Sequence, residues 1–275
     1  MTLNRARGRR KRLISAVAVL CAGLVSLAGP AQASSPEGEA APPETGDHAM
    51  GSQIRKHEGG GGPVVMPKDA PLATVNGMDV SGHQGNVDWK YWWDEGMRFA
   101  FVKATEGTGY KNPYFAQQYN GSYDVGMIRG AYHFALPDRS SGAAQANFFV
   151  DNGGGWSADG KTLPGALDME YNPYGSTCYG KSKSEMTAWI KDFSDTYHDR
   201  TGRYPVIYTS TSWWNQCVNG DFSSTNPLWV ARYADSVGDL PYNWSIWTFW
   251  QYTSSPLDKD LFNGSYERLQ ALAKG

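Results

Sequence analysis

Two carboxylates stand one residue apart in Asp168-Met169-Glu170, at the end of an apolar run over residues 163–169. Turn-forming residues flank this run, which predicts a short buried strand that stops at a loop. Successive side chains of a strand alternate between its faces, so Asp168 and Glu170 should point the same way. Two acids held this close raise each other's pKa, and a protonated acid beside an ionised one is the pair that cleaves a glycosidic bond. Such a pair is more often simply exposed to solvent, so a catalytic role needs support from other residues of the chain.

The elements that would position this pair alternate between strand and helix. The pattern of apolar and turn residues predicts strands over 74–80, 99–103, 127–135, 163–169, 205–209, 227–233 and 246–252. Helical patterns fall over 87–95, 112–123, 142–150 and 211–216. The clearest helix begins at Ser182, which forms a capping box with Glu185, and it ends at Gly202. Alternation of this kind predicts parallel strands of the α/β class. We expect an irregular, TIM-barrel-like (β/α) barrel whose final strands lack full helices.

The chemistry of such barrels lies where the strands run out into loops, and the predicted strand ends are unusually polar and aromatic. A groove for carbohydrate explains both features, because sugar rings stack on aromatic side chains while their hydroxyls bond to polar groups. The expected substrate-binding residues are Tyr132, Phe134, Tyr171, Tyr208, Trp229, Arg232, Tyr233 and Gln251. Packing in the core remains the alternative for about half of the aromatic residues.

Other polar residues at the strand ends receive structural assignments. Lys103 and Glu106 are expected to pair in the barrel mouth, and His133 to be a hydrogen-bonded strand residue. His83 is expected in a turn near Asp79. Five histidines without paired ligand spacing give no reason to expect a metal or a cofactor.

The first part of the chain has the composition of an export signal. Residues 1–33 combine six basic residues, an apolar stretch and Ala31-Gln32-Ala33, which predicts a signal peptide and a secreted, extracellular protein. Residues 34–71 are rich in Pro, Gly, Glu and Ser and are expected to be a flexible arm or a pro-segment. Residues 72–275 are then the catalytic domain.

Removal of the signal peptide changes the charge and the cysteine count. It leaves 19 basic and 27 acidic residues, a formal net charge of −8. This acidic balance argues against nucleic acid and anionic membranes as partners, and we expect a monomer. Cys178 and Cys217 are the cysteines that remain, and in an exported protein they are expected to form a disulfide, with two buried thiols as the alternative.

Several motifs in series resemble glycoside hydrolase family 25, the Chalaropsis-type lysozymes or N-acetylmuramidases. The motifs are GMDVSGHQG (77–85), FVKATEG (101–107), GAYHF (130–134), LDME (167–170), PVIYT (205–209), LWVARY (228–233), WQY (250–252) and LD (257–258). They span nearly all of residues 75–264. Each motif alone is weak, and their order along the chain makes the resemblance specific.

The resemblance implies hydrolysis of the β-1,4 bond between N-acetylmuramic acid and N-acetylglucosamine in bacterial peptidoglycan, including 6-O-acetylated muramic acid. It implies Glu170 as general acid and Asp168 as stabiliser of positive charge or orienter of the 2-acetamido group. Asp79 is implied as a second stabiliser or the nucleophile, and Asp258 as an electrostatic support. Strand spacing alone cannot choose between retention and inversion; the resemblance favours retention, with Asp79 or the acetamido oxygen as nucleophile. A chitin hydrolase, a wall-binding module without catalysis and a peptidoglycan amidase remain the alternatives.

Overall fold

The computed structural model describes residues 46–60, 67 and 73–275. Within these ranges the strands are β1 Val75–Val80, β2 Phe99–Glu106, β3 Tyr110–Lys111, β4 Ile128–Phe134, β5 Ala166–Asp168, β6 Val206–Thr209, β7 Leu228–Ala231, β8 Phe249–Thr253 and β9 Lys259–Phe262. The helices are α1 Ser52–Glu58, α2 Trp89–Asp94, α3 Phe115–Asp124, α4 Gly142–Phe149, α5 Lys183–Thr201, α6 Thr211–Cys217 and α7 Tyr266–Lys274, with short helical turns at Gly82–Gln84 and Val150–Gly154. No helix of the described ranges is long and apolar enough to cross a membrane. The predicted signal peptide lies outside the described residues.

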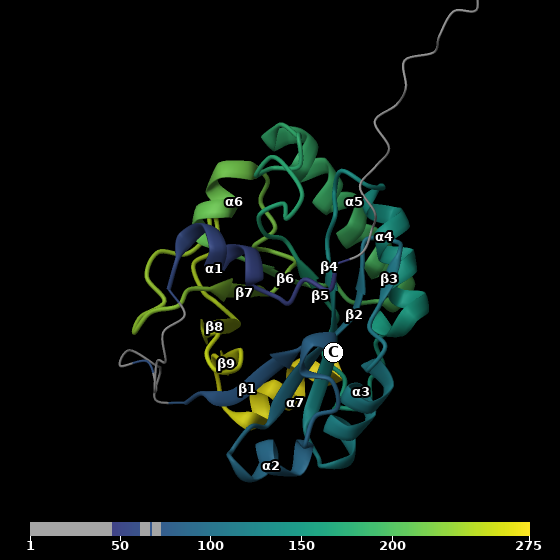
Figure 1. Ribbon diagram of the computed structural model, residues 1–275, viewed down its shortest axis with the longest axis vertical. Helices are drawn as coiled ribbons and strands as arrows, with labels where there is room; N and C mark the ends of the chain where they lie inside the picture. The colour runs from purple at the N-terminus through teal and green to yellow at the C-terminus, as the bar shows by residue number, and fades with distance from the viewer. Residues whose placement is uncertain (1–45, 61–66, 68–72) are drawn as a thin grey trace, which may run out of the picture. The chain divides into compact units, whose positions relative to one another are not determined.

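The strands form a closed barrel (Figure 1), which confirms the predicted fold class. The order β1-β9-β8-β7-β6-β5-β4-β2 is closed by pairing between β1 and β2, and β3 extends β2 as a hairpin. The pairs from β1–β2 through β7–β8 are parallel, whereas β9 runs antiparallel to both β8 and β1. The sequence did not predict β9, because its short run is interrupted by Lys259 and Asp260. Full helices are missing between β7, β8 and β9, as expected.

The predicted long helix is present as α5, with the predicted ends. Ser182 and Glu185 form the capping box, and Gly202 ends the helix in the left-handed region with φ 75°. Its apolar stripe is buried, and this face packs against α4. Gly142 is required at that contact, because a Cβ there would lie 2.5 Å from the backbone nitrogen of Phe193.

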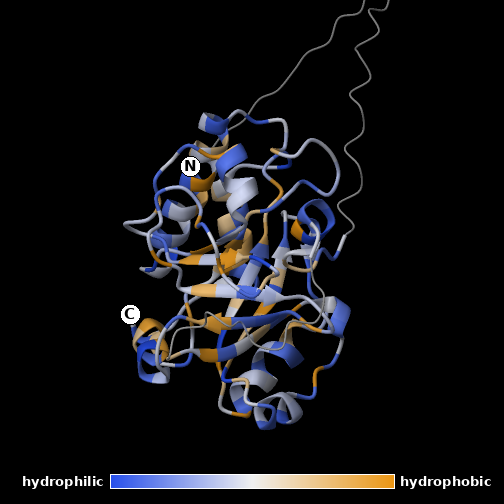
Figure 2. Ribbon diagram, turned by 90° about the vertical axis from the view of Figure 1, so that its left-hand side faces the viewer, coloured by the Kyte–Doolittle hydropathy of each residue, from blue (hydrophilic) through white to orange (hydrophobic). Residues whose placement is uncertain are grey.

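Aromatic rings fill the barrel interior beneath the loops. The rings of Phe101 and Trp229 lie 4.5 Å apart, and both contact Phe249. All three side chains are buried, and the hydrophobic residues of the strands follow this interior (Figure 2). The interior is therefore a packed core that supports the mouth at the carboxyl ends of the parallel strands.

The two cysteines are bonded to each other. Cys178 and Cys217 form a disulfide with a Cα–Cα distance of 5.4 Å. It joins the loop that follows β5 to α6, which confirms the prediction and removes the alternative of two thiols.

Candidate active site

Five buried carboxyl groups gather at the mouth of the barrel, and we call them the acidic cluster. Its members are Asp79, Asp168, Glu170, Asp258 and Asp260. Asp79 lies at the end of β1, Asp168 ends β5, and Asp260 lies in β9, where it pairs with Gln251 of β8. The parallel strands and the antiparallel β9 bring together acids that are far apart in the sequence. Four of the five were predicted; Asp260 was missed, although it repeats with Asp258 the i, i+2 spacing of Asp168 and Glu170.

The paired acids after β5 differ in their surroundings. Neither oxygen of Asp168 has a hydrogen-bond partner among the described residues. Burial raises the pKa of Asp168 well above its ordinary value, and the nearby Glu170 carboxyl raises it further. Burial also raises the pKa of Glu170, to about 8, although backbone N–H groups of Ile54, Gln53 and Gly51 oppose this rise. Burial raises both pKa values, as expected, but a neighbouring acid is a cause only for Asp168 and not for Glu170.

Asp79 is held from the opposite side of the mouth. The side-chain amide of Gln251 donates to Oδ2 of Asp79 over 2.7 Å, and Oε1 of Gln251 accepts from the hydroxyls of Tyr208 and Tyr233. Burial and the carboxyls of Asp258 and Asp260 raise the pKa of Asp79 well above its ordinary value. Gln251 was predicted to bind substrate, and in the structure it orients an acid.

Asp258 and Asp260 complete the cluster from the last strand pair. Burial raises the pKa of Asp258 to about 7, and Arg55 opposes that rise. The indole nitrogen of Trp229 donates to Oδ1 of Asp260 over 3.1 Å. Trp229 was predicted to bind substrate, but the structure places its ring in the barrel core beneath the cluster.

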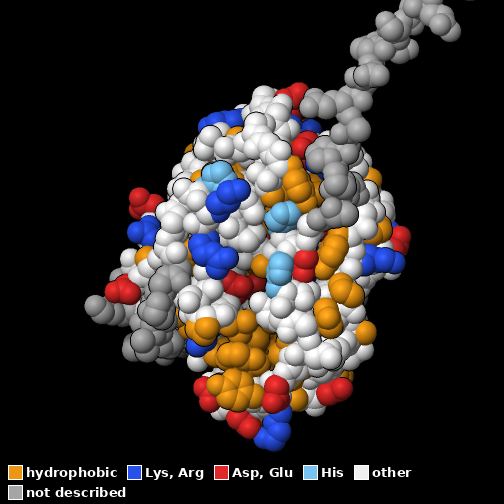
Figure 3. Space-filling model, in the orientation of Figure 1, with side chains coloured by type: hydrophobic (Ala, Val, Ile, Leu, Met, Phe, Trp, Pro, Cys, Tyr) orange, Lys and Arg blue, Asp and Glu red, His pale blue; other side chains and the backbone are white. Residues whose placement is uncertain are grey.

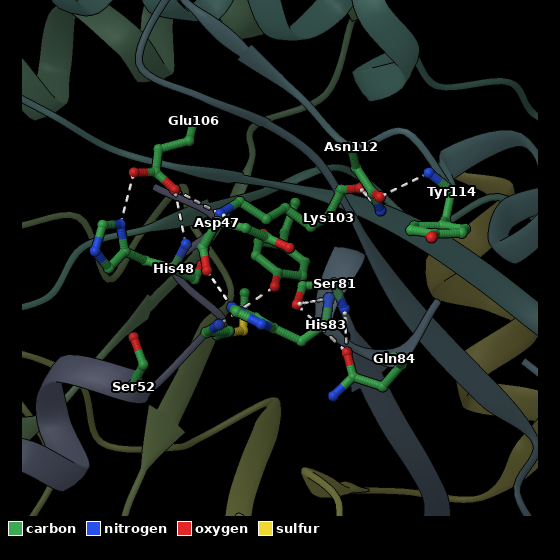
Figure 4. A network of polar contacts seen from close by, with 12 residues as sticks. Asp47, His48, Ser52, Ser81, His83, Gln84, Lys103, Glu106, Asn112 and Tyr114 are labelled. Carbon is green, nitrogen blue, oxygen red and sulfur yellow. Dashed lines mark hydrogen bonds and ion pairs between the residues drawn. The ribbon is translucent and has the colours of Figure 1, made fainter. Parts of the chain in front are cut away.

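A buried ion pair lies beside the cluster (Figure 4). Nζ of Lys103 lies 2.6 Å from Oε2 of Glu106, which confirms the predicted pair. His48 also binds Glu106, with Nδ1 2.7 Å from Oε1. Burial raises the pKa of Glu106, but His48 and Lys103 outweigh it and the pKa is lowered. The Lys103 ammonium in turn lowers the pKa of both Asp168 and Glu170.

His133 is a strand residue with both ring nitrogens bonded, as predicted. Thr105 Oγ1 lies 2.7 Å from Nδ1, and Gln145 Oε1 lies 2.9 Å from Nε2. Burial lowers its pKa to about 4. His83 lies in the helical turn Gly82–Gln84 that follows β1. Among the described residues no three His, Cys, Asp or Glu side chains are grouped to hold a metal ion.

The other predicted substrate-binding residues lie around the mouth at different depths. Tyr132, Phe134 and Tyr208 are buried, Tyr171 is 7% exposed, and Arg232 is exposed. Three of them, Tyr132, Tyr171 and Tyr233, hydrogen-bond to residues 46–60, a part of the chain predicted to be an arm or a pro-segment. Tyr171 stacks on His57 with ring centroids 4.4 Å apart, and the hydroxyl of Tyr233 donates to the Gly51 carbonyl.

Residues 46–60 therefore differ from the structureless arm that their composition indicates. They form α1 and the irregular stretch before it, and they contact the mouth directly. Few apolar residues mark this helix in the sequence: Met50 and Ile54 are buried in the hydrophobic core, and its other contacts with the barrel are polar. No local periodicity could have found it.

Comparisons with known proteins agree with the arrangement. The family model described as "Glycosyl hydrolases family 25" matches residues 78–261. Lysozyme M1 of Streptomyces globisporus is 44% identical over 97% of this chain and 96% of its own length. The N,O-diacetylmuramidase of Chalaropsis sp. is 46% identical, and its whole length covers 74% of this chain. The solved structure of a bacterial lysozyme from Streptomyces coelicolor is 48% identical, with a TM-score of 0.71 over 74% of this chain and 99% of that one. The chain thus belongs to glycoside hydrolase family 25 and is a glycoside hydrolase of the muramidase kind.

Proposed function

We propose that the protein is a secreted lysozyme that hydrolyses the β-1,4 bond between N-acetylmuramic acid and N-acetylglucosamine in bacterial peptidoglycan. The observation that carries this proposal is the pair Asp168 and Glu170, both buried at the carboxyl end of β5 with raised pKa values. A glycosidase needs one acid that keeps its proton at working pH and one that is ionised beside it. Glu170 supplies the protonated acid, and Asp168 is the proposed partner, which has to ionise when substrate is bound.

Glu170 is proposed as the general acid. Its proton passes to the glycosidic oxygen while the bond from that oxygen to C1 of the muramic acid breaks. A pKa near 8 keeps this carboxyl protonated at neutral pH. In the second half of the reaction the Glu170 carboxylate accepts a proton from the attacking water, and the acid is restored.

Asp168 and Asp79 are proposed to act on the sugar itself. Asp168 stabilises the positive charge that develops at C1 or orients the 2-acetamido group, and its unpartnered oxygens support this role. For retention, the bond to C1 in the intermediate is made by Asp79 or by the acetamido oxygen. Gln251 holds Asp79 in place, and Asp258 supports the cluster electrostatically.

The protein is further proposed to accept 6-O-acetylated muramic acid and to act outside the cell. Relatives named N,O-diacetylmuramidase, from Chalaropsis sp. and Arthroderma benhamiae, support tolerance of 6-O-acetylated muramic acid. Tyr171, Tyr233 and Arg232 are the proposed sugar contacts on the rim. The basic and apolar composition of residues 1–33 supports export, and the acidic mature chain supports a monomer that binds neither nucleic acid nor membrane.

The bond that is cut tests this function. Mass spectrometry of the products from purified peptidoglycan, after reduction with borohydride, should find reduced muramic acid at every new end, with or without 6-O-acetylation. Products that end in reduced N-acetylglucosamine, or free stem peptides, would contradict the assignment. Faster release from chitin than from peptidoglycan would favour the chitin hydrolase instead.

A further inference from the structure

Residues 46–60, which we call the mouth segment, bind the proposed catalytic acid directly. The backbone N–H groups of Gln53 and Ile54 donate to Oε2 of Glu170 over 2.9 and 2.8 Å, and that of Gly51 donates to Oε1 over 3.0 Å. These three donors fill positions on the carboxyl that a glycosidic oxygen has to approach. Figure 1 shows the segment, with α1, crossing the barrel, and its hydrogen bonds to Glu170 place it over the acidic cluster.

The start of the mouth segment binds the neighbouring ion pair. Oδ1 of Asp47 lies 3.1 Å from Nζ of Lys103, which also donates to the His48 carbonyl over 2.7 Å. His48 binds Glu106 through both its ring and its backbone nitrogen. Figure 4 shows these contacts together, and Figure 3 shows histidine and charged side chains at the centre of the same face. The segment is therefore held at two places, at Glu170 and at the Lys103–Glu106 ion pair.

The segment lies between two hollows of the barrel mouth. One, of about 500 Å³, is lined by Gly46 to Ala49, Ser52, Gln53 and Arg55 of the segment together with His83, Gln84, Ser254 and Pro256 to Asp258. The other, of about 360 Å³, is lined by its residues 54–60 together with Thr211, Arg232 and Tyr233. Beneath the segment Asp79, Asp168 and Glu170 are at most 1% exposed. A polysaccharide cannot reach these acids while the segment lies between the two hollows.

The three N–H donors of the segment also act against the protonated form of Glu170, although burial still holds its pKa at about 8. Three N–H donors favour the ionised form of Glu170, whereas Asp168 has no donor among the described residues and so favours its neutral form. Catalysis as proposed needs a protonated Glu170 and an ionised Asp168. The segment thus opposes the reaction electrostatically as well as sterically.

Relatives of family 25 exist without such a segment. The whole Chalaropsis protein aligns to 74% of this chain, which is the share that residues 73–275 make up (203 of 275). Lysozyme M1, in contrast, aligns over 97% of the chain.

We propose that the mouth segment is an intramolecular inhibitor that occupies the substrate cleft until it is separated from the barrel or displaced. The inference rests on the proposed function, because it takes Glu170 and its neighbours as the reactive groups. It predicts that the intact chain is nearly inactive and that the segment behaves as a pro-segment.

Gly51 and Gly59 offer a matched pair of variants in the intact chain. Both have φ 74°, but ψ is 0° at Gly51, which alanine tolerates at moderate cost, and −166° at Gly59, a region adopted essentially by glycine alone. Backbone strain therefore weighs more heavily on the control than on the test variant, and only the side-chain collisions favour a larger effect at Gly51. A Cβ at Gly51 would collide with the hydroxyls of Tyr233 and Tyr208 and lie 2.6 Å from Oε1 of Gln251, whereas a Cβ at Gly59 would meet nothing within 4 Å. Gly51→Ala should unseat the segment, and Gly59→Ala should not. Neither residue belongs to the proposed catalytic machinery.

The test compares peptidoglycan hydrolysis by the two variants, with the covalent integrity of each chain checked by intact mass. Gly51→Ala should be about tenfold or more faster than Gly59→Ala and wild type, since the rate follows the fraction of open molecules. It should also bind tri-N-acetylchitotriose more tightly, and the amides of Gly51, Gln53 and Ile54 should lose protection from hydrogen exchange.

The outcomes separate this inference from the proposed function. Equal rates and equal chitotriose affinity in the two variants, with the amides of Gly51→Ala exchanging freely, would overturn the inhibitor. Intact wild type as active as Gly51→Ala would do the same. Tighter chitotriose binding by Gly51→Ala without any cleavage of peptidoglycan would uphold the inhibitor and contradict the proposed reaction.

Discussion

Asp168 is buried at the end of β5 with no donor among the described residues to stabilise its charge. Such a group persists because it is useful, since a buried carboxyl without a partner destabilises the fold when it ionises. The same strand end could have held an asparagine at little cost to folding. The proposed role of Asp168 in the reaction accounts for its presence at this cost in stability.

Replacement of Asp168 should accordingly make the protein more stable. Its folded-state pKa is raised above the unfolded value of about 4, so its favourable contribution is present below about pH 4 and is lost as pH rises through the folded pKa. Asp168→Asn should unfold at the same temperature as wild type near pH 4 and be more stable by about 0.5–2 kcal/mol at pH 8. Thermal unfolding across this range measures the difference.

An exposed acid provides the control for that measurement. Asp199 lies on α5 with its side chain 85% exposed, and Asp199→Asn should leave the pH profile unchanged. A profile for Asp168→Asn that is parallel to that of wild type would mean that Asp168 titrates normally in the folded protein.

The loop after β5 carries Glu170 and Tyr171, and the next helix, α5, begins only at Lys183. The disulfide between Cys178 and Cys217 ties this loop to α6. The two cysteines are 39 residues apart, and closure of a loop of that size limits the unfolded chain by roughly 4 kcal/mol at most. The bond therefore stabilises the part of the mouth that is otherwise least supported.

Removal of this bond should weaken folding more than it alters the chemistry. The double variant Cys178→Ser/Cys217→Ser should lose roughly 2–4 kcal/mol of unfolding free energy in urea. Wild type treated with reductant should unfold at the same urea concentration as the double variant. Thiol labelling of unreduced protein that finds both cysteines free would contradict the bond itself.

The elements also show what a sequence can predict. Apolar runs bounded by turn residues located seven of the eight barrel strands, because burial on both faces leaves a continuous hydrophobic signal. The exception, β9, is short and charged, and its identity depends on pairing with β8 and β1 rather than on its own residues. The helix α7 was missed as well, although its ends lie close to capping signals at Ser265 and Lys274.

The closure of the barrel determines which of the predicted site residues lie close together. Strand-end positions identified Asp79, Asp168 and Glu170 because a parallel barrel collects such ends on one face. Asp258 was identified only through the family resemblance. Sequence could not tell that Trp229 faces the core, since the inner and outer faces of a short strand look alike when both are apolar. It also could not show that residues 46–60 cover the cluster, because those contacts join parts of the chain more than 110 residues apart.

Glu170 and Asp168 are proposed to act as acid and stabiliser, and the mouth segment covers both in the intact chain. The direct test is therefore made in the Gly51→Ala background, with rates measured on peptidoglycan and on an aryl glycoside whose leaving group needs little protonation. Glu170→Gln should lose about 10²–10⁴-fold on peptidoglycan and recover most of that loss on the aryl glycoside. Asp168→Asn should be slow on both substrates. Rescue of Asp168→Asn instead would mean that the two residues have the opposite roles. Rescue of neither variant, or near-normal rates of both on peptidoglycan, would contradict the proposed roles of this acid pair.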